Sequence, residues 1–285
     1  MNSNMNVVLR KEDGSTSVLL FLYNMLYTKT GQTGLRLASL LEIMGTFGKA
    51  ESAARMALSR AGKTGLLESS RQGRDIVYSL TTQAKDYISE WNSGAACFWR
   101  RFDRRSQSWD GKWHLISLLV DDTAFKSDAA ELMEELGYAQ VGSGQFLGPW
   151  DVWVDLDGLL RQAGAAVHVA SVSGELRTES GAEGFVESTF RLCELRALYK
   201  SFLERYSPLL EQLRTEEARE GKSSSVSPLP TLQQLGFEFF RVASKDMMLP
   251  RELYPDWEGE LAAFLMRDLR LILEERSWRY LQGFL

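Results

Sequence analysis

The run from Glu51 to Leu80 constrains this sequence most, because a helix pattern of small residues gives way within it to a hairpin pattern. Its first part repeats apolar residues at positions i, i+3, i+4 and i+7, namely Ala54, Ala57, Leu58 and Ala61. That spacing predicts a helix with one buried face and leaves serine and arginine on the other face. Gly62 and Gly65 follow, and a residue without Cβ can turn the chain there. We therefore expect an amphipathic helix that ends near these glycines.

The second part of this run predicts two strands joined by a basic turn. Leu66 and Leu67 begin an extended segment, Arg71–Arg74 form a polar, glycine-containing turn, and Ile76–Leu80 alternate as a return strand. A helix followed by a hairpin with a basic tip is typical of a winged helix-turn-helix, in which the helix lies in the major groove and the wing follows the phosphates. The alternative is an ordinary surface helix and hairpin whose arginines are only solvated.

The residues before and after this run complete one small domain. Val18–Tyr27 is an apolar first helix, Leu35–Met44 is a second, and Gly45–Gly48 is a tight turn before the third. Thr82–Trp91 is a short closing helix after the return strand. Three helices and a wing in so short a stretch fit one DNA-binding domain, which we place at residues 15–91.

This domain and two later stretches resemble a known family. SAARMALSRAGKTGLLESSRQGRDIVYSLT is similar to the N-terminal part of the phenylacetic-acid-degradation repressor family, the PaaX-like transcriptional regulators, whose helix has the form VRxALSRLxxxGWL and whose wing has the form RxGRRSYYSLT. The matching positions are Arg55, Ala57, Leu58, Ser59, Arg60, Gly65, Leu67, Gly73, Arg74, Tyr78, Ser79, Leu80 and Thr81. WDGKWHL at Trp109–Leu115 also matches, and DMMLPRELYPDWEGELA at Asp246–Ala262 resembles the family's DPxLPxxLLPxxWPGxxA.

The resemblance implies a sequence-specific, DNA-binding transcriptional regulator rather than an enzyme. It implies a repressor of an aromatic-acid catabolic operon of the phenylacetate type, released by an aryl-acyl-CoA effector. It also implies a homodimer on double-stranded, pseudo-palindromic operator DNA, because operator symmetry mirrors protein symmetry. The family pattern is broken at a few positions. Asp75 stands where a second wing arginine is usual and would repel phosphate, Ala61 replaces a leucine, and Gly31 and Gly34 precede the second helix.

The expected DNA contacts come from the helix and the turn. The polar helix face would reach base edges or phosphates, the lysines near its two ends would contact the backbone, and two arginines of the turn would lie on the backbone or in the minor groove. In chain order these residues are Lys49, Ser52, Arg55, Ser59, Arg60, Lys63, Arg71 and Arg74.

The charge distribution agrees with a DNA-binding N-terminal region. Residues 1–92 carry a net charge of +3 and residues 93–112 another +3, whereas the whole chain carries −5. Residues 92–111 mix small, aromatic and basic side chains, and we expect a basic hinge there. Its arginines come in two adjacent pairs, Arg100, Arg101, Arg104 and Arg105. They belong either to a solvated connector or to an anion site for DNA backbone or a phosphate-bearing effector.

Residues 112–173 predict a ferredoxin-like middle domain. The strand WHLISLLV is followed by a helix, an extended segment, a strand, a helix and a strand, at Phe125–Leu136, Tyr138–Leu147, Val152–Val154, Leu156–Ala163 and Ala165–Val172. This βαββαβ order is that of a split βαβ unit. In PaaX-like proteins the middle domain resembles a small CRISPR-associated nuclease of that fold. Asp121 and Asp122 follow the first strand, so a metal-dependent nuclease is an alternative function, although such a pair is more often a polar turn.

Residues 185–285 predict a helical C-terminal domain, so the whole chain is expected to be α+β and multidomain. Its helices are expected at Phe185–Glu220, Leu232–Val242 and Leu261–Gln282. A domain of this kind either pairs two copies or binds a ligand, and the spacing of its residues does not decide between them. A further alternative for the whole chain is a winged-helix module that binds another protein.

Composition excludes several classes of protein. Cys97 and Cys193 form no CxxC pair, the N-terminus lacks the apolar stretch of a signal peptide, and no apolar run reaches the ~20 residues of a membrane span. We therefore expect a cytoplasmic protein with no membrane partner. His114 and His168 are the only histidines, and the sequence contains no phosphate-binding loop or nucleophile motif. We expect no catalytic residue, no metal and no cofactor.

Overall fold

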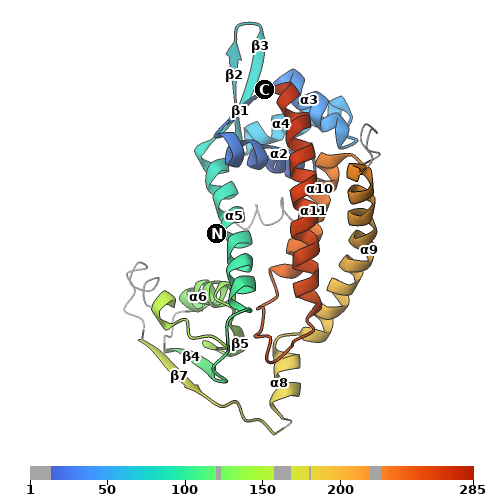
Figure 1. Ribbon diagram of the computed structural model, residues 1–285. Coiled ribbons are helices and arrows are strands. Elements are labelled where there is room, and N and C mark those ends of the chain that lie inside the picture. The colour runs from blue at the N-terminus through green and yellow to red at the C-terminus, as the bar shows by residue number, and fades with distance from the viewer. Residues whose placement is uncertain (1–13, 120–122, 157–167, 180, 219–225) are drawn as a thin grey trace. The chain divides into compact units, whose positions relative to one another are not determined.

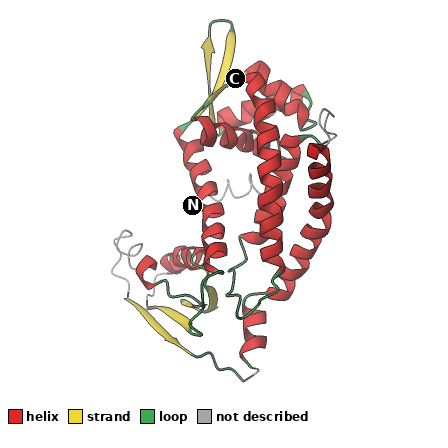
Figure 2. Cartoon of the chain, viewed as in Figure 1, coloured by secondary structure: helices red, strands yellow, loops and turns green. Residues whose placement is uncertain are grey.

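The computed structural model describes residues 14–119, 123–156, 168–179, 181–218 and 226–285, which form helices and two small antiparallel sheets (Figure 2). The chain divides into two compact units that alternate along its length. Unit 1 consists of Met1–Ser93, Ser207–Glu238 and Leu265–Leu285, and unit 2 consists of Gly94–Tyr206 and Phe239–Phe264. The C-terminal part of the sequence therefore contributes helices to both units.

The N-terminal part of unit 1 contains three helices and a three-stranded sheet (Figure 1). In chain order these elements are α2 (Ser15–Thr30), β1 (Gly34–Arg36), α3 (Leu37–Thr46), α4 (Glu51–Lys63), β2 (Leu67–Gln72) and β3 (Asp75–Leu80). The strands lie in the order β1-β3-β2 and are all antiparallel. The predicted helices and hairpin are confirmed with one correction. Leu35 belongs to β1 rather than to the second helix, because its backbone pairs with that of Tyr78 on β3.

Two glycines allow the short strand β1 to form. Gly31 has a φ of 72°, and its N–H donates to the carbonyl oxygen of Tyr27 at 2.9 Å, which ends α2. A Cβ at Gly34 would lie 2.8 Å from Oγ of Ser79 on β3, so the two strands approach this closely only without a side chain there. The glycines that depart from the family pattern therefore build the strand that supports the hairpin.

The core of unit 1 combines N-terminal residues with residues from far along the sequence. α2, α3 and α4 supply most of its buried side chains. Leu229 of α10 (Pro228–Ala243) and Leu281 of α11 (Glu258–Leu281) belong to the same cluster. The N-terminal helices therefore share their core with C-terminal helices, and no local sequence pattern reveals such a long-range contact.

One long helix, α5 (Thr82–Arg104), occupies the positions of the predicted closing helix and of most of the predicted hinge. Its last turns and the residue that follows bury one face at helical spacing: Cys97, Phe98, Arg101, Phe102 and Arg105. Gly94 inside the helix costs only about 1 kcal/mol relative to alanine. The predicted hinge is therefore helical over residues 92–104, because this buried face stabilises the helix beyond its small residues, and the boundary between the two units falls at Ser93/Gly94.

Unit 2 contains a four-stranded antiparallel sheet. Its elements are β4 (Trp113–Leu119), α6 (Thr123–Glu135), β5 (Ala139–Gly142), β6 (Gln145–Gly148) and β7 (His168–Gly174). The strands lie in the order β5-β6-β4-β7, with β4 antiparallel to both of its neighbours. Ile116, Met133 and Phe146 are at most 1% exposed in one cluster, so α6 packs on a face of this sheet.

The predicted strand Val152–Val154 is wrong, because residues 153–156 are helical. The N–H of Leu156 donates to the carbonyl oxygen of Val152 at 2.9 Å, and both side chains are buried in the core of unit 2. Burial four residues apart is helical spacing rather than strand alternation. Most of the predicted helix Leu156–Ala163 lies outside the described residues, as do Asp121, Asp122 and the side chain of His168.

The C-terminal helices include α8 (Ala182–Thr189) and α9 (Leu192–Ala218) besides α10 and α11. The single helix predicted at Phe185–Glu220 is therefore two helices, and Arg191 between them has a φ of 53°, which a helix cannot accommodate. α10 begins at Pro228, four residues before the predicted start at Leu232, because proline is tolerated in the first turn of a helix. Within the described residues, none of the helices is both long enough and apolar enough to cross a membrane.

Candidate nucleic-acid interface

α4 has a buried apolar face and an exposed polar face. Ala54, Ala57, Leu58 and Ala61 are at most 1% exposed and belong to the core of unit 1. The exposed face presents most of the predicted DNA contacts: Ser52, Arg55, Ser59, Arg60 and Lys63. The helix therefore brings these side chains onto one surface, and neither Arg55 nor Arg60 points into the protein.

Hydrogen bonds around the end of α4 fix the direction in which the hairpin leaves it. The N–H of Leu66 donates back into the last turn of α4 at 2.9 Å, and Gly65 before it has a φ of 74°. Oγ1 of Thr81, which follows β3, donates to the carbonyl oxygen of Gly65 at 2.5 Å. The hydroxyl of Tyr23 on α2 donates to the carbonyl oxygen of Tyr78 on β3 at 2.6 Å, and burial raises the pKa of Tyr23, so the phenol remains a donor.

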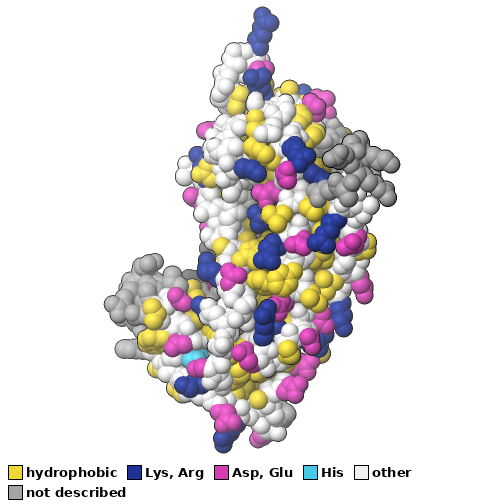
Figure 3. All heavy atoms as spheres, in the orientation of Figure 1, with side chains coloured by type: hydrophobic (Ala, Val, Ile, Leu, Met, Phe, Trp, Pro, Cys, Tyr) yellow, Lys and Arg dark blue, Asp and Glu magenta, His cyan; other side chains and the backbone are white. Residues whose placement is uncertain are grey.

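The hairpin carries both predicted wing arginines. β2 and β3 pair along their whole length, and only Gly73 and Arg74 form the loop, so the turn is shorter than the predicted Arg71–Arg74. Gly73 has a φ of 63°, as the first position of a tight hairpin loop requires. Arg71 is exposed on β2, and Figure 3 shows basic side chains at the tip of this hairpin.

Most of these basic side chains have no ion-pair partner among the described residues. This group consists of Arg60, Lys63, Arg71 and Arg74. Arg55 differs, because its Nε donates to the carboxylate of Glu51 one turn earlier at 2.8 Å. The two side chains are 52% and 65% exposed, and an exposed pair contributes only about 0–1 kcal/mol. Arg55 can therefore exchange Glu51 for a nucleic-acid partner at small cost.

Asp75, which stands where the family usually has a wing arginine, has a basic neighbour that the sequence does not predict. Nε of Arg36 on β1 lies 3.7 Å from the Asp75 carboxylate, and both side chains are more than half exposed. The pair reduces the negative charge that Asp75 presents beside the loop. A three-residue strand is too short to show an alternation pattern in the sequence. Only the register of the sheet, with Arg36 opposite Val77, shows that this arginine lies close to Asp75.

Lys49 is half buried rather than on the exposed face of α4. It precedes the helix, and its backbone N–H donates to the carbonyl oxygen of Met44 at 3.2 Å. With Phe47 and Gln233 it lines a cavity of 170 Å³ inside unit 1. Its role as a DNA backbone contact stays a prediction.

Arg101, predicted as part of an anion site, is buried inside unit 2 at 7% exposure. Its guanidinium donates to the main-chain oxygens of Asp246 and Glu135 at 3.1 and 2.9 Å. Burial lowers the pKa of Arg101, and the nearby Asp246 carboxylate opposes that shift. This side chain joins α5 to α6 and to the loop before α11, so it is not open to an effector.

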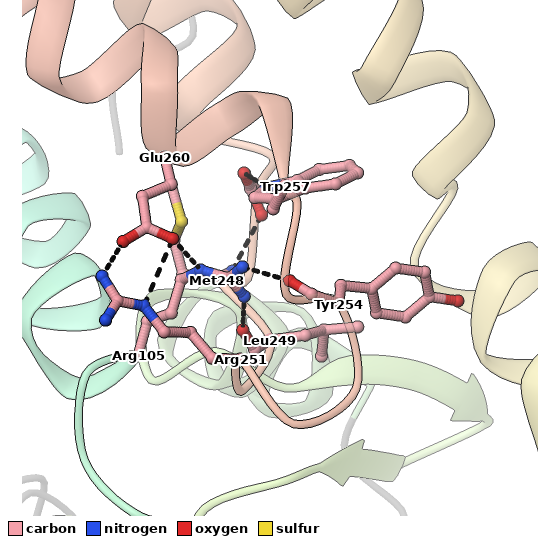
Figure 4. A network of polar contacts seen from close by, with 8 residues as sticks. Arg105, Met248, Leu249, Arg251, Tyr254, Trp257 and Glu260 are labelled. Carbon is pink, nitrogen blue, oxygen red and sulfur yellow. Dashed lines mark hydrogen bonds and ion pairs between the residues drawn. The ribbon is translucent and has the colours of Figure 1, made fainter.

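Arg105 is buried still more completely, at 1% exposure (Figure 4). Its two Nη atoms donate to the carbonyl oxygens of Leu249 and Tyr254, and its Nε donates to the carboxylate of Glu260 at 3.1 Å. Arg251, which is about half exposed, pairs with the same carboxylate. The prediction of an anion site open to solvent therefore does not hold for Arg105, because all three of its donor groups already have protein partners.

A buried carboxylate stabilises the segment Asp246–Ala262, which resembles the family's DPxLPxxLLPxxWPGxxA motif. Asp246 is 1% exposed and accepts from Nε1 of Trp257 and from the N–H of Met248, both at 2.8 Å. Burial raises the pKa of Asp246, and these hydrogen bonds only partly offset that shift. The N–H of Trp109, in the WDGKWHL motif, donates to Glu252 at 3.0 Å. Two motifs that lie far apart in the sequence therefore meet around one loop.

The other two arginines of the predicted anion site remain nearer the surface. Arg100 is exposed, and one Nη lies 2.8 Å from Sγ of Cys97. Arg104 is partly exposed and lies 3.6 Å from the Asp155 carboxylate. Only these two members of the cluster are accessible to a dissolved anion.

Comparisons with known proteins agree with the resemblance. Residues 15–84 match the family described as PaaX-like protein, and residues 190–283 match the PaaX-like protein C-terminal domain. The transcriptional repressor PaaX of Escherichia coli (strain K12) is 31% identical over 257 residues, which cover 87% of this chain and 76% of the relative. Uncharacterized protein Rv0674 from Mycobacterium tuberculosis has a similar fold, with a TM-score of 0.53 and 18% identity over 93% of this chain and 97% of that structure.

Proposed function

This chain belongs to the PaaX-like family, and we propose on that premise that it is a transcriptional repressor that binds double-stranded operator DNA. One observation carries the proposal. α4 presents serine, arginine and lysine on successive turns of one face, while the opposite face lies in the core. A rigid helix with such a face suits the major groove, where side chains read base edges.

We assign the three helices and the hairpin of unit 1 to a winged helix-turn-helix. The support is the order α2, α3, α4 and a β2–β3 hairpin whose loop carries Arg74. In this assignment α4 is the recognition helix and the hairpin is the wing. Arg55, Ser59 and Arg60 contact bases or phosphates, and Arg71 and Arg74 follow the backbone. Ser52, Lys49 and Lys63 add contacts near the ends of α4. The exposed Arg36, which lies opposite Val77 on β3, extends the basic surface of the wing.

The regulated genes that fit the family are those of an aromatic-acid catabolic pathway of the phenylacetate type. We propose that the protein binds a pseudo-palindromic operator as a homodimer, because a twofold protein reads two half-sites related by the same symmetry. We further propose that an aryl-acyl-CoA effector releases the operator. Arg100 and Arg104 are the arginines of the α5 cluster that remain available to the phosphates of such a ligand, because Arg101 and Arg105 are buried.

We assign the sheet of unit 2 to a ferredoxin-like fold and propose no catalysis there. The support is the strand order β5-β6-β4-β7 with antiparallel neighbours, in which the last strand of the βαββαβ sequence pairs with the first, and the two middle strands follow on the other side. The fold does not by itself imply nuclease activity. In this proposal unit 2 contributes Arg100 and Arg104 to effector binding and carries out no reaction.

A salt-dependent binding assay with the DNA flanking the protein's own gene tests the proposal. The full chain should bind this duplex more tightly than a scrambled duplex of equal length, and the logarithm of its affinity should fall linearly with the logarithm of salt concentration. Adding phenylacetyl-CoA should release the duplex, whereas free CoA and acetyl-CoA serve as matched controls for the nucleotide and the thioester. Equal affinity for both duplexes at every salt concentration would contradict sequence-specific binding.

A further inference from the structure

Met56 is the one large apolar side chain that α4 exposes, at 57% of its surface. It lies one residue after Arg55 and is flanked along the helix by Ser52, Ser59 and Arg60, which are all exposed. These positions fall at i−4, i−1, i+3 and i+4 relative to Met56, so they surround it on one helix face. The polar surface of α4 therefore has an apolar centre.

The fold does not account for the exposure of Met56. Among the described residues, the buried core of unit 1 and the partly buried apolar side chains packed against it do not include this methionine. The core-facing side of α4 is already filled by Ala54, Ala57, Leu58 and Ala61. Met56 thus adds no packing to that core, and more than half of its surface faces water in the absence of a partner.

One chemical group in the major groove is recognised through an apolar contact. Thymine alone among the four bases carries a methyl group there, and proteins read that methyl by placing an apolar side chain against it. Methionine is suited to this contact, because it is unbranched, flexible and polarisable and so adapts to a small apolar target. Serine and arginine on the same face offer hydroxyl and guanidinium groups, which suit acceptors and phosphates instead.

We infer that Met56 contacts a thymine 5-methyl group in each operator half-site and so helps to determine which sequence the protein selects. This inference rests on the proposed function, because it needs α4 to lie in the major groove. It adds a base-reading residue that is neither charged nor polar, and it assigns that residue a single atom group on the DNA. Met56 is thereby a specificity residue rather than one that supplies general affinity.

The test changes the DNA by one methyl group. The probe is a duplex that the full-length protein selects from a random pool, made again with each thymine in turn replaced by deoxyuridine, which lacks only the 5-methyl. For the wild-type chain, each half-site should contain one thymine whose single replacement weakens binding about fourfold. This is the change expected from losing the burial of one methyl-sized group. Met56→Leu should keep this sensitivity, whereas the near-isosteric Met56→Gln should bind the thymine and uracil duplexes equally.

A matched variant controls for the loss of any exposed apolar side chain. Leu271 on α11 is 67% exposed in unit 1, and Leu271→Gln should leave the thymine-to-uracil ratio as it is in the wild type. The inference is overturned if Met56→Gln keeps the wild-type ratio, or if no thymine position is sensitive. A changed sedimentation coefficient of Met56→Gln with an unchanged ratio would instead make Met56 a protein-contact residue. If no duplex is enriched at all, the proposed function itself fails first.

Discussion

Arg105 and Glu260 form a buried ion pair, with Nε of the arginine 3.1 Å from a carboxylate oxygen and the side chains 1% and 10% exposed. They are 155 residues apart in the sequence, so the pair joins the end of α5 to the first turn of α11. Arg251 pairs with the same carboxylate, but its side chain is 49% exposed. One glutamate therefore has a buried and an exposed partner, which allows the effect of burial to be measured at a single site.

Replacing the buried partner should be far more costly than replacing the exposed one. Arg105→Met leaves a buried carboxylate with only its outer partner and leaves the carbonyl oxygens of Leu249 and Tyr254 without their donors, so we expect a loss of about 3–5 kcal/mol in the free energy of unfolding. Arg251→Met should cost less than about 1 kcal/mol, as for other exposed pairs. Urea unfolding followed by tryptophan fluorescence measures both. Equal losses would show that burial does not set the strength of this site.

Acid should weaken unit 2 through the same glutamate. Burial raises the pKa of Glu260, but hydrogen bonds from Arg251 and Arg105 outweigh it and bring the pKa below the ordinary value of 4.5. The folded state therefore binds the proton less readily than the unfolded state, so the contribution of Glu260 is complete above about pH 4.5 and is lost as the pH falls through the folded pKa. Urea midpoints between pH 3 and pH 7 should fall less steeply with acid in Glu260→Gln than in the wild type. A steeper fall in the variant would reverse the assigned direction.

Gly259 should be intolerant of any side chain. A Cβ there would lie 2.4 Å from Nε1 of Trp257 and 2.7 Å from an Asp246 carboxylate oxygen, both within the buried network. Gly259→Ala should therefore destabilise the protein by more than about 2 kcal/mol through overpacking and loss of that hydrogen bond. A Cβ at Gly236 in α10 would meet no neighbouring atom within 4 Å, so Gly236→Ala should instead stabilise by up to about 1 kcal/mol. Thermal unfolding should show a lower melting temperature for Gly259→Ala and a higher one for Gly236→Ala. An unchanged melting temperature of Gly259→Ala would contradict the predicted overpacking.

The local elements of the N-terminal region follow from the sequence because each has a short-range signal. The alanine stripe of α4, the glycines after it and the alternation of the hairpin all act within a few residues of one another. The path of α5 does not follow in this way. Asn92–Ala96 resembles a linker in composition. The aromatic and arginine side chains that follow this stretch stabilise the helix by packing against residues far along the chain.

The candidate site shows the same division. Ser59 and Arg60 could be placed on an exposed face from helical spacing alone. The burial of Arg101 and Arg105 could not, because an arginine pair looks alike whether its partners are solvent, phosphate or main-chain carbonyls far along the chain. The partners lie in the Asp246–Ala262 segment, and only the fold brings that segment to α5. A basic motif therefore predicts an anion site well only where long-range partners are absent.

The wing should contribute to affinity without reading sequence. Arg74 lies in the hairpin loop, so Arg74→Ala should weaken binding to every duplex by a similar factor and lower the slope of log affinity against log salt by about 1. Asp75→Asn should act in the opposite direction, because it removes a negative charge beside that loop and frees Arg36 from its exposed pair. Fluorescence anisotropy over a range of salt concentrations measures both slopes. An unchanged slope for both variants would remove the hairpin from the interface.

Replacing Arg60 should distinguish a sequence-specific base contact from general electrostatic attraction to DNA. Arg60 is exposed in the last turn of α4 and has no ion-pair partner among the described residues, so its replacement breaks no internal ion pair. If it contacts a base, Arg60→Ala should weaken operator binding by about 1–3 kcal/mol and relax the preference at one position of the site, with scrambled DNA affected much less. Arg270→Ala is the matched control, because Arg270 is an exposed arginine on α11 of the same unit whose ion-pair partner, among the described residues, is Glu274 one turn away. Removing either arginine changes the net charge equally, so the difference between the two variants isolates the position from the charge. Equal losses on operator and scrambled DNA for Arg60→Ala would make Arg60 a phosphate contact, and no loss on either would exclude this face of α4 from the DNA.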